Sequence, residues 1–497
     1  MPKILGVSLP KVFLVTAALI AIACGIALRA SHTTDRPLHT DEAVQAWQTW
    51  QLLQGEGYRY DPVDMHGPTL YHGAAWWTRL TGGSAATFDD FRARSFSLLA
   101  GALTLLLFWR WTSMNLGVGA ALAVALLLAM MPLAVVYSTY FIQEPWLALG
   151  SWALLFAAMR WWREPTFATA VACGILAGFV QATKETSVIH FAAIVIALFA
   201  LGGPRPIARQ FLAHGAAAFA AAAVVFVAFY SGFGAHPGGI IDGLLTYKHQ
   251  FARAGDGAFE QPFFHYFAML LPHRTGGVMW GETGLFVCAV AGFVLALRRG
   301  APAPVRAVAV FTLVLLLIYS AIPHKMPWIL LTPALGLATL AGFALSRLAS
   351  VSRWGIAASI ALAAAVAIEL GFRSERALGR FAGDVRNPYF LEQTPRGFTK
   401  LTAELDRIFS AEPGARVAVV SPNHAWPLPW YLRDRETVGY YQVPPADPAA
   451  WDVRILDSQL EAPASWNDDA VVGIHGLRPN VVLTLSVSEP LWERVHP

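Results

Sequence analysis

Long apolar runs are the feature of this 497-residue chain that most restricts its fold. A helix needs about 20 apolar residues to cross a bilayer, and a search for such runs predicts about eleven spans. They lie near residues 11–30, 91–110, 117–137, 145–162, 166–182, 187–203, 211–232, 280–297, 306–323, 326–346 and 354–372. Of all residues, 56% are hydrophobic and only 14% are charged. We therefore expect a mainly α-helical, polytopic membrane protein.

The basic residues at the span ends predict its orientation. The first run, from Lys11 to Ala30, lacks a small-residue cleavage signature, so we expect a retained helix rather than a removed signal peptide. If the spans alternate, one side collects Lys3, Lys11, Arg110, Arg160, Arg163, Arg205, Arg209, Arg298, Arg299, Arg347 and Arg353. Positive residues favour the cytoplasmic side. The sequence thus predicts a multi-pass protein of the cytoplasmic (inner) membrane with a cytoplasmic N-terminus.

The opposite, outer face then receives most of the polar segments. Two are long loops, at residues 31–90 and 235–279, and the others are short turns around Glu144, Lys184 and His324. After a transmembrane domain of residues 1–372, hydropathy falls, and residues 373–497 predict a small extracytoplasmic α/β domain. Its expected elements are a helix at 398–409 and strands at 416–420 and 481–485. Chemically useful residues therefore gather at one membrane surface.

Composition excludes several function classes. The net charge is only +4 and the basic residues are scattered, so no nucleic-acid partner is expected. All three cysteines, Cys24, Cys173 and Cys288, lie in apolar runs, which argues against a disulfide or metal-thiolate framework. The histidines of the 235–279 loop lack compact zinc-ligand spacing. No nucleotide-binding or hydrolase motif stands in a suitable context.

The first outer loop contains the acidic pair Asp41 and Glu42. Residues 43–53 and 68–80 have the spacing of amphipathic helices on the membrane surface. The polar stretch between them is suited to presenting carboxylates and aromatic faces to a sugar, and contains Tyr58, Tyr60, Asp61, Asp64 and His66. For Asp41 there is also a structural alternative, because aspartate is a favoured helix N-cap. The two roles are compatible.

A second acid, Glu144, stands immediately before Pro145 at the expected start of a helix. Its carboxylate is suited to binding a divalent metal, to orienting an acceptor, or simply to facing headgroup water. Paired across space with Asp41, it would form a two-carboxylate site for general base catalysis or for a divalent cation such as Mg or Mn.

Two cations are expected near the same surface. Lys184 and Glu185 occupy a tight turn, where the lysine either snorkels, pairs with Glu185 or binds a lipid phosphate. His324 and Lys325 precede an interfacial tryptophan in a similar turn and are alternatively headgroup anchors. For both lysines together we favour the phosphate. His249 lies on a predicted amphipathic helix, residues 240–251, which is expected to cover the site.

The multispan layout, the Asp41–Glu42 pair after the first span, Glu144 after the third and the Lys184–Thr186 turn resemble the GT-C superfamily of integral-membrane glycosyltransferases. Five motifs look most like those of one narrower family, the flippase-activity-associated proteins of archaea and bacteria. The motifs are His39–Glu42, His66–Pro68, Ala182–Thr186, Lys325–Trp328 and His424–Arg433. The likeness extends over nearly the whole chain. It implies a GT-C fold and transfer of a sugar from a polyprenyl-phosphate-linked donor on the outer face of the membrane.

The resemblance also implies roles for individual residues. It implies that Asp41 is the catalytic base or a metal ligand and that Glu144 is the second acid. It also implies that Lys325, together with Lys184, binds the phosphate of the donor. Glu42, His66, Glu185, His324 and His249 are the further substrate-binding candidates. One departure concerns the turn at residues 137–144, which lacks the arginine that often precedes the second acid.

The sequence leaves alternatives open. The expected partners of a glycosyltransferase are a polyprenyl-phosphate-linked sugar, membrane lipids and a glycan, lipid or protein acceptor. The alternative is a noncatalytic protein that binds lipid-linked glycans or assists a flippase. A transporter fits less well, because the ionisable residues gather at one face rather than at mid-membrane. Two prolines exclude a regular helix in His424–Arg433, so this segment either binds glycan or docks on the membrane domain.

Overall fold

The computed structural model describes residues 3–4, 7–8, 11–63, 65–202, 208–253, 257, 259–466 and 469–495. Asp64 and Arg205 of the sequence predictions lie outside these residues. The chain forms two compact units. The first, here the membrane unit, comprises Met1–Thr33 and Gln48–Arg380, and the second, here the sheet unit, comprises Thr34–Trp47 and Phe381–Pro497. Segment 34–47, expected in the first domain, thus belongs with the C-terminal residues.

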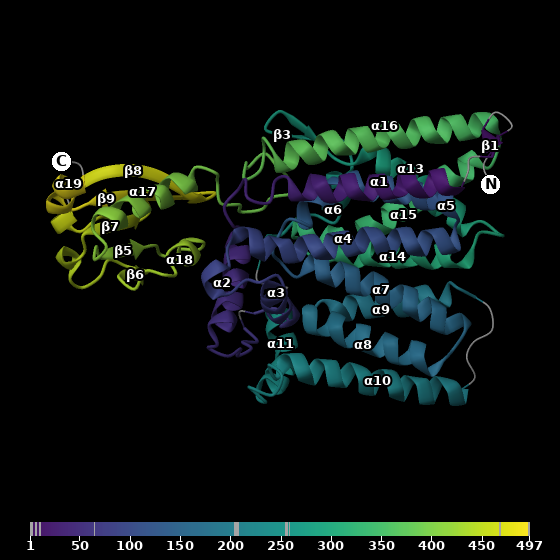
Figure 1. Ribbon diagram of the computed structural model, residues 1–497, viewed down its shortest axis with the longest axis horizontal. Coiled ribbons are helices and arrows are strands. Elements are labelled where there is room, and N and C mark those ends of the chain that lie inside the picture. The colour runs from purple at the N-terminus through teal and green to yellow at the C-terminus, as the bar shows by residue number, and fades with distance from the viewer. Residues whose placement is uncertain are drawn as a thin grey trace. The chain divides into compact units, whose positions relative to one another are not determined.

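The membrane unit is a bundle of helices (Figure 1). Its long helices are α1 (Lys11–Ala30), α4 (Asp90–Asn115), α5 (Val118–Met130), α7 (Glu144–Arg163), α8 (Phe167–Thr183), α9 (Ser187–Phe199), α10 (Ala208–Tyr230), α13 (Thr283–Leu297), α14 (Ala303–Ala321), α15 (Leu331–Ala349) and α16 (Arg353–Leu378). Shorter elements are α3 (Thr69–Leu80), η1 (Ala85–Thr87), α6 (Pro132–Tyr137), α11 (Gly239–Arg253), α12 (His265–Leu270) and η2 (Pro327–Leu330). Two small hairpins are β1 (Lys3–Ile4) with β2 (Val7–Ser8), and β3 (His273–Thr275) with β4 (Val278–Trp280). Helix α2 (Thr40–Gln54) begins in the sheet unit and ends in the membrane unit.

Six described helices are long and apolar enough to cross a membrane: α1, α4, α10, α14, α15 together with η2, and α16. Helices α5, α8, α9 and α13 are apolar but shorter. Each predicted span overlaps a helix, but the count of about eleven spans is not established by these lengths. The predicted run 117–137, for example, is broken, because Pro132 starts a new helix, α6. The chain is a multi-pass membrane protein.

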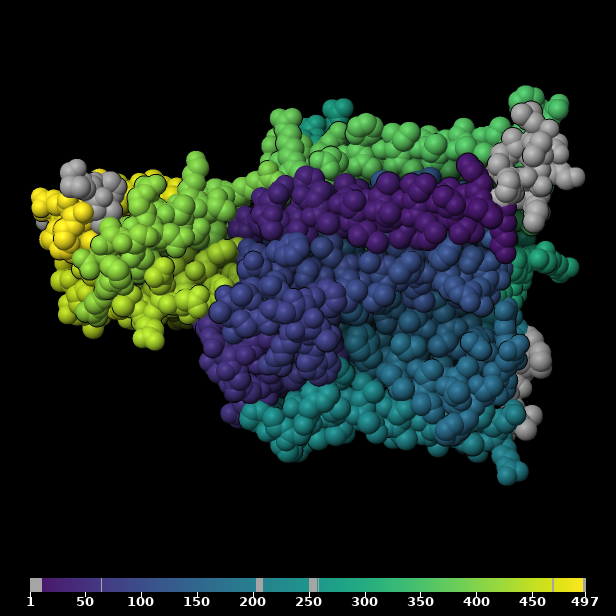
Figure 2. Space-filling view, viewed as in Figure 1, coloured from purple at the N-terminus to yellow at the C-terminus, as the bar shows by residue number. Residues whose placement is uncertain are grey.

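Close packing between the helices depends on glycines. A Cβ atom added to Gly174 would lie 2.1 Å from the Ala218 carbonyl oxygen, and one added to Gly292 would lie 1.9 Å from that of Leu340. These glycines therefore let α8 approach α10 and α13 approach α15, as small residues commonly do in membranes. Helix α10, packed on α8, forms one edge of the bundle (Figures 1 and 2).

The sheet unit contains a five-stranded mixed sheet in the order β6-β5-β7-β9-β8. Strand β5 pairs in parallel with β6 and β7, whereas β9 pairs antiparallel with β7 and β8. The strands are β5 (Val417–Val420), β6 (Val438–Tyr441), β7 (Val453–Asp457), β8 (Ala470–Arg478) and β9 (Val481–Val487), and the helical elements are α17 (Phe398–Ala411), α18 (Leu428–Tyr431), η3 (Pro448–Ala450), η4 (Ala464–Trp466) and α19 (Glu489–Val495). Helix α17 buries Leu401 and Leu405 in the same apolar core as Val417 and Leu485. The predicted C-terminal helix and strands are therefore present.

Candidate catalytic residues

At the start of α2, residues other than Asp41 cap the helix. His39 is the N-cap, because its Nδ1 accepts the backbone N–H of Asp41 at 3.0 Å. Glu42, at the third helical position, accepts the N–H of His39 at 3.0 Å and completes a reciprocal capping arrangement. The predicted N-cap role of Asp41 is therefore wrong. Its side chain is 47% exposed and available for chemistry.

Glu42 has the opposite environment. Its carboxylate is fully buried and lies 2.5 Å from Nη1 of Arg36, which is also buried. His39 is held in turn, since its Nε2 lies 2.8 Å from the Leu391 carbonyl oxygen and donates to it. Glu42 and Arg36 thus fix the helix start that presents Asp41. A direct contact between Glu42 and substrate stays a prediction.

The motif His424–Arg433 packs against the segment that carries Asp41, within the sheet unit. The Leu38 N–H donates to the Tyr431 hydroxyl at 2.8 Å, and the Trp47 and Trp426 rings meet edge to face at 6.0 Å. This motif therefore holds the acidic segment. The sequence predicted docking on the membrane domain or glycan binding, and did not foresee that the motif docks on residues 34–47.

Arg478 of β8 also holds the His424–Arg433 motif, through hydrogen bonds to His424. Its Nη1 donates to His424 Nδ1 at 3.0 Å and to the His424 carbonyl oxygen at 3.1 Å. Burial, and next the charge of Arg478, lower the pKa of His424 to about 4, although the carboxylate of Asp41 opposes the shift. His424 is thus neutral near pH 7 and is electrostatically coupled to Asp41. Sequence reasoning missed Arg478, because an arginine in a strand carries no motif of its own.

In the membrane unit, Glu144 and Lys184 form a buried ion pair. Glu144 is the first residue of α7, where the positive end of the helix dipole also favours a carboxylate. Lys184 follows the last residue of α8 in extended conformation, which turns its side chain out of the helix. The sequence expected Lys184 to pair with Glu185, if with any carboxylate. The structure instead joins it to an acid 40 residues away.

Glu185 pairs with His66 of the first loop, whose Nδ1 lies 2.9 Å from the carboxylate. The loop can approach because Gly67 has no side chain: a Cβ atom there would lie 2.2 Å from the Ala182 carbonyl oxygen. Beside it, the Thr69 hydroxyl donates to that of Thr183 at 2.8 Å. The structure thus brings together three predicted motifs, those at His66, Glu144 and Lys184–Glu185.

This pairing predicts a pH dependence of stability. Burial alone would raise the pKa of Glu185, but the charge and hydrogen bond of His66, with Lys184, lower it from 4.5 to about 2. Because the folded-state pKa is lowered, its contribution of about 3 kcal/mol is present above pH 4.5 and disappears as the pH falls towards 2. Thermal unfolding between pH 2 and pH 5 should show this loss in the wild type and a smaller one in Glu185→Gln. An equal slope in both proteins would contradict the pairing.

Lys325 is buried at the end of α14. Its ammonium donates to the carbonyl oxygens of Ser320, at 2.9 Å, and Ile322, and lies 5.7 Å from the centre of the Tyr266 ring. Burial lowers its pKa. These contacts cap the helix, and the predicted phosphate contact would use the remaining donor capacity of the ammonium.

The turn that contains Lys325 is joined to the end of the 235–279 loop. The N–H of Lys325 donates to the Phe259 carbonyl at 3.1 Å, and the backbones of His324 and Glu260 pair in an isolated antiparallel β-bridge. His324 is half-buried. His249, also half-buried, lies on α11, in the segment predicted to be a covering helix. The ligand roles of these two histidines stay predictions.

The predicted divalent cation requires a set of oxygen ligands. The described residues contain no cluster of three or more histidines, cysteines or carboxylates that would hold a metal ion. Glu144 is already ion-paired with Lys184, and Asp41 and Glu144 fall in different units. The expected pairing of the two acids, and the cation that it would bind, therefore stay predictions.

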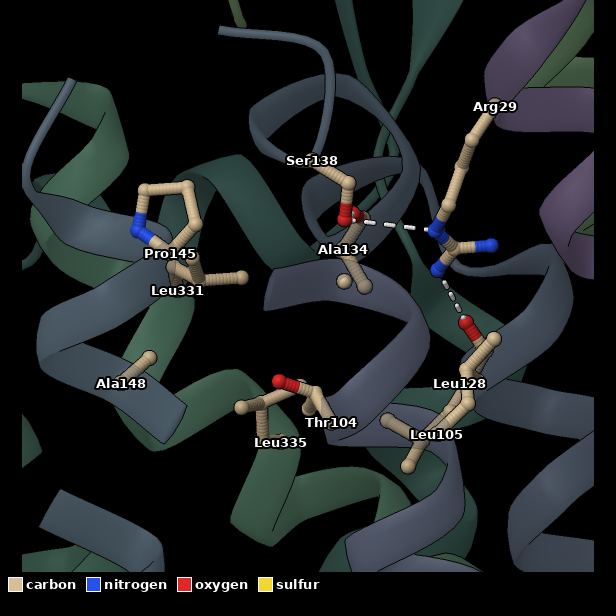
Figure 3. A pocket seen from close by; sticks show the side chains of 11 residues that line it. Arg29, Thr104, Leu105, Leu128, Ala134, Ser138, Pro145, Ala148, Leu331 and Leu335 are labelled. Atoms are coloured by element: carbon tan, nitrogen blue, oxygen red, sulfur yellow. Dashed lines mark hydrogen bonds between the residues drawn. The ribbon is translucent and has the colours of Figure 1, made fainter. Parts of the chain in front are cut away.

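A small cavity lies around Arg29, at the break between α5 and α6 (Figure 3). The guanidinium of Arg29 donates to the carbonyl oxygens of Leu128 and Ala129, at 2.8 and 2.9 Å, and to the Ser138 hydroxyl at 3.2 Å. These bonds satisfy carbonyls at the end of α5. The cavity measures about 20 Å³. It can hold about one water molecule, which excludes a sugar.

Comparisons with known proteins agree with this architecture. The family model described as dolichyl-phosphate-mannose-protein mannosyltransferase matches residues 72–230, about a third of the chain. The crystal structure of ArnT from Cupriavidus metallidurans bound to undecaprenyl phosphate superposes with a TM-score of 0.63 at 14% identity, covering 95% of this chain and 97% of that chain. The chain has the GT-C glycosyltransferase fold.

A second solved structure supports the same fold. Archaeal oligosaccharyltransferase AglB from Archaeoglobus fulgidus, in complex with an inhibitory peptide and a dolichol-phosphate, gives a TM-score of 0.58 at 13% identity, covering 90% of this chain and 69% of that chain. Among curated protein sequences, none matches this chain. The family match over residues 72–230 and the two structural similarities thus agree on the fold of the chain.

Proposed function

We propose that the protein transfers a sugar from a polyprenyl-phosphate-linked donor to an acceptor on the outer face of the cytoplasmic membrane. The observation that carries the proposal is the carboxylate of Asp41, half-exposed at a helix start that His39 caps. The fold is shared with ArnT, bound to undecaprenyl phosphate, and with AglB, bound to a dolichol-phosphate. The motif resemblance to flippase-activity-associated proteins is part of this proposal.

The proposed reaction gives Asp41 the role of general base. The acceptor hydroxyl oxygen attacks the anomeric carbon of the sugar, and its proton passes to the Asp41 carboxylate. The bond from the anomeric carbon to the phosphate oxygen breaks, and polyprenyl phosphate leaves with the electron pair. Positive charge near that oxygen stabilises the transition state, most strongly where water is excluded.

Lys184 and Lys325 supply that charge in this proposal. Both ammonium groups are buried, and Glu144 holds Lys184 in place. Glu144 thus assists by positioning Lys184, rather than by accepting a proton. His66 and Glu185 fix the adjacent turn, so the ammonium of Lys184 is held before substrate arrives.

Reconstitution tests the proposal. Purified protein in liposomes is supplied with polyprenyl-phosphate hexoses and with glycan, lipid or peptide acceptors, and mass spectrometry measures released polyprenyl phosphate and glycosylated product. Equimolar release and transfer are expected. Binding of the donors without cleavage, whichever acceptor is present, would favour the noncatalytic lipid-glycan-binding alternative. A parallel assay with EDTA, followed by Mg or Mn, tests the predicted cation.

A further inference from the structure

A large cavity opens at the end of the membrane unit where α1 and α16 begin, near the mark N in Figure 1. It measures about 780 Å³, within the range of ligand sites. Its walls are residues of α1, α5, α15 and α16, with the turn between α4 and α5. Leu14, Leu122, Ile356 and Ile360 make much of the wall apolar.

The polar lining of this cavity is cationic or neutral. Lys11 and Arg353, both exposed, are its charged residues, and no acidic side chain of the described chain lines it. Ser346, Ser350 and Ser352 add hydroxyl groups. Ser352 is also the N-cap of the 26-residue helix α16, so the positive end of that helix lies at the cavity as well.

The cavity is separate from the proposed catalytic residues. Helix α5 begins in the cavity wall at Val118 and ends at Met130, and α6 and the turn to Glu144 follow it. Helix α4 likewise runs about 39 Å from Asp90 to Asn115, just before the cavity residue Leu116. A ligand in this cavity would therefore not contact the Glu144–Lys184 pair.

We propose that this cavity binds one anionic glycerophospholipid, with the phosphate at Lys11 and Arg353 and an acyl chain along the apolar wall. Basic pockets between transmembrane helices recognise anionic headgroups, because cations and apolar surface match both parts of such a lipid. A free phosphate would meet the cations but leave the apolar wall uncovered. A zwitterionic lipid would bring its own positive charge to two cations.

The test uses detergent-purified full-length protein and native mass spectrometry with added phosphatidylglycerol or phosphatidylcholine. We expect the wild type to retain one phosphatidylglycerol in preference to phosphatidylcholine. Lys11→Gln/Arg353→Gln should weaken phosphatidylglycerol binding roughly tenfold or more. The matched control is Arg298→Gln/Arg299→Gln, which removes two exposed cations outside the cavity and should bind as the wild type does.

A second variant tests the apolar part. Gly119 lines the cavity, and a Cβ atom there would meet nothing within 4 Å, so Gly119→Leu adds an apolar side chain at a wall position with room for its first carbon. It should weaken binding of phosphatidylglycerol while both cations remain. Equal phosphatidylglycerol binding by the wild type and the Lys11/Arg353 double variant would overturn the proposal, and so would displacement of the lipid by millimolar inorganic phosphate.

Discussion

Replacement of Asp41 by asparagine is expected to reduce sugar transfer about 10²- to 10⁴-fold, the usual contribution of a general base. The amide of asparagine has the shape of the carboxylate but cannot take the proton of the acceptor hydroxyl. Stability should stay within about 0.5 kcal/mol, because the helix is capped by His39 and the Asp41 side chain is half-exposed. Initial rates in liposomes and the Tm of the same preparation measure both effects.

The neighbouring acid provides the control. Glu42→Gln removes the buried partner of Arg36 and should cost about 3–5 kcal/mol, because an uncompensated charge stays in the interior. Substitutions of these two adjacent residues thus have different predicted effects: Asp41→Asn lowers turnover, whereas Glu42→Gln lowers stability. Full transfer by Asp41→Asn would refute its role as the base, and a large fall in Tm for that variant would show a structural role instead.

The sequence predicted the helical elements closely, because the length of an apolar run is restricted by the bilayer. The run predicted at 11–30 is α1, and those at 145–162 and 166–182 differ from α7 and α8 by one residue at each end. The break at Pro132 was not predicted. Pro132 causes the break, and the hydropathy of the run does not reveal it. Arg29, from another helix, binds the carbonyl oxygens of Leu128 and Ala129 at the end of α5, and hydropathy contains no information on such a contact.

The partners of the charged residues were predicted less well. Lys184 was assigned to a phosphate or to its neighbour Glu185, whereas the fold joins it to Glu144, and joins Glu185 to His66. A single sequence does not reveal which charged residues pair in the fold when the partners lie far apart along the chain, because no regular spacing connects them. The capping of α2 was missed for a local reason, because statistics favour aspartate over histidine at an N-cap. His190 was also missed: its ring links Ser151 of α7 to Tyr319 of α14, at 2.6 and 2.7 Å.

The Glu144–Lys184 pair gives the second large prediction. Lys184→Gln leaves the carboxylate of Glu144 buried without its cation, so the single variant should lose about 3–5 kcal/mol of stability. In Glu144→Gln/Lys184→Gln no buried charge remains, and two amides can still hydrogen-bond. The double variant should therefore recover most of the lost stability, as replacements of whole buried ion pairs commonly do. Tm values of the wild type, both single variants and the double variant complete the cycle.

Transfer activity separates the structural task of the pair from its proposed chemical task. If Lys184 supplies charge to the departing phosphate, the double variant will be stable but inactive, with a reduction of about 10²-fold or more, because no cation has replaced the ammonium. Lys184→Arg, which keeps the charge, should retain more activity than the stable double variant does. If the pair only holds α7 against the end of α8, transfer will recover in the double variant together with Tm, and the assignment of Lys184 to the donor phosphate will be wrong.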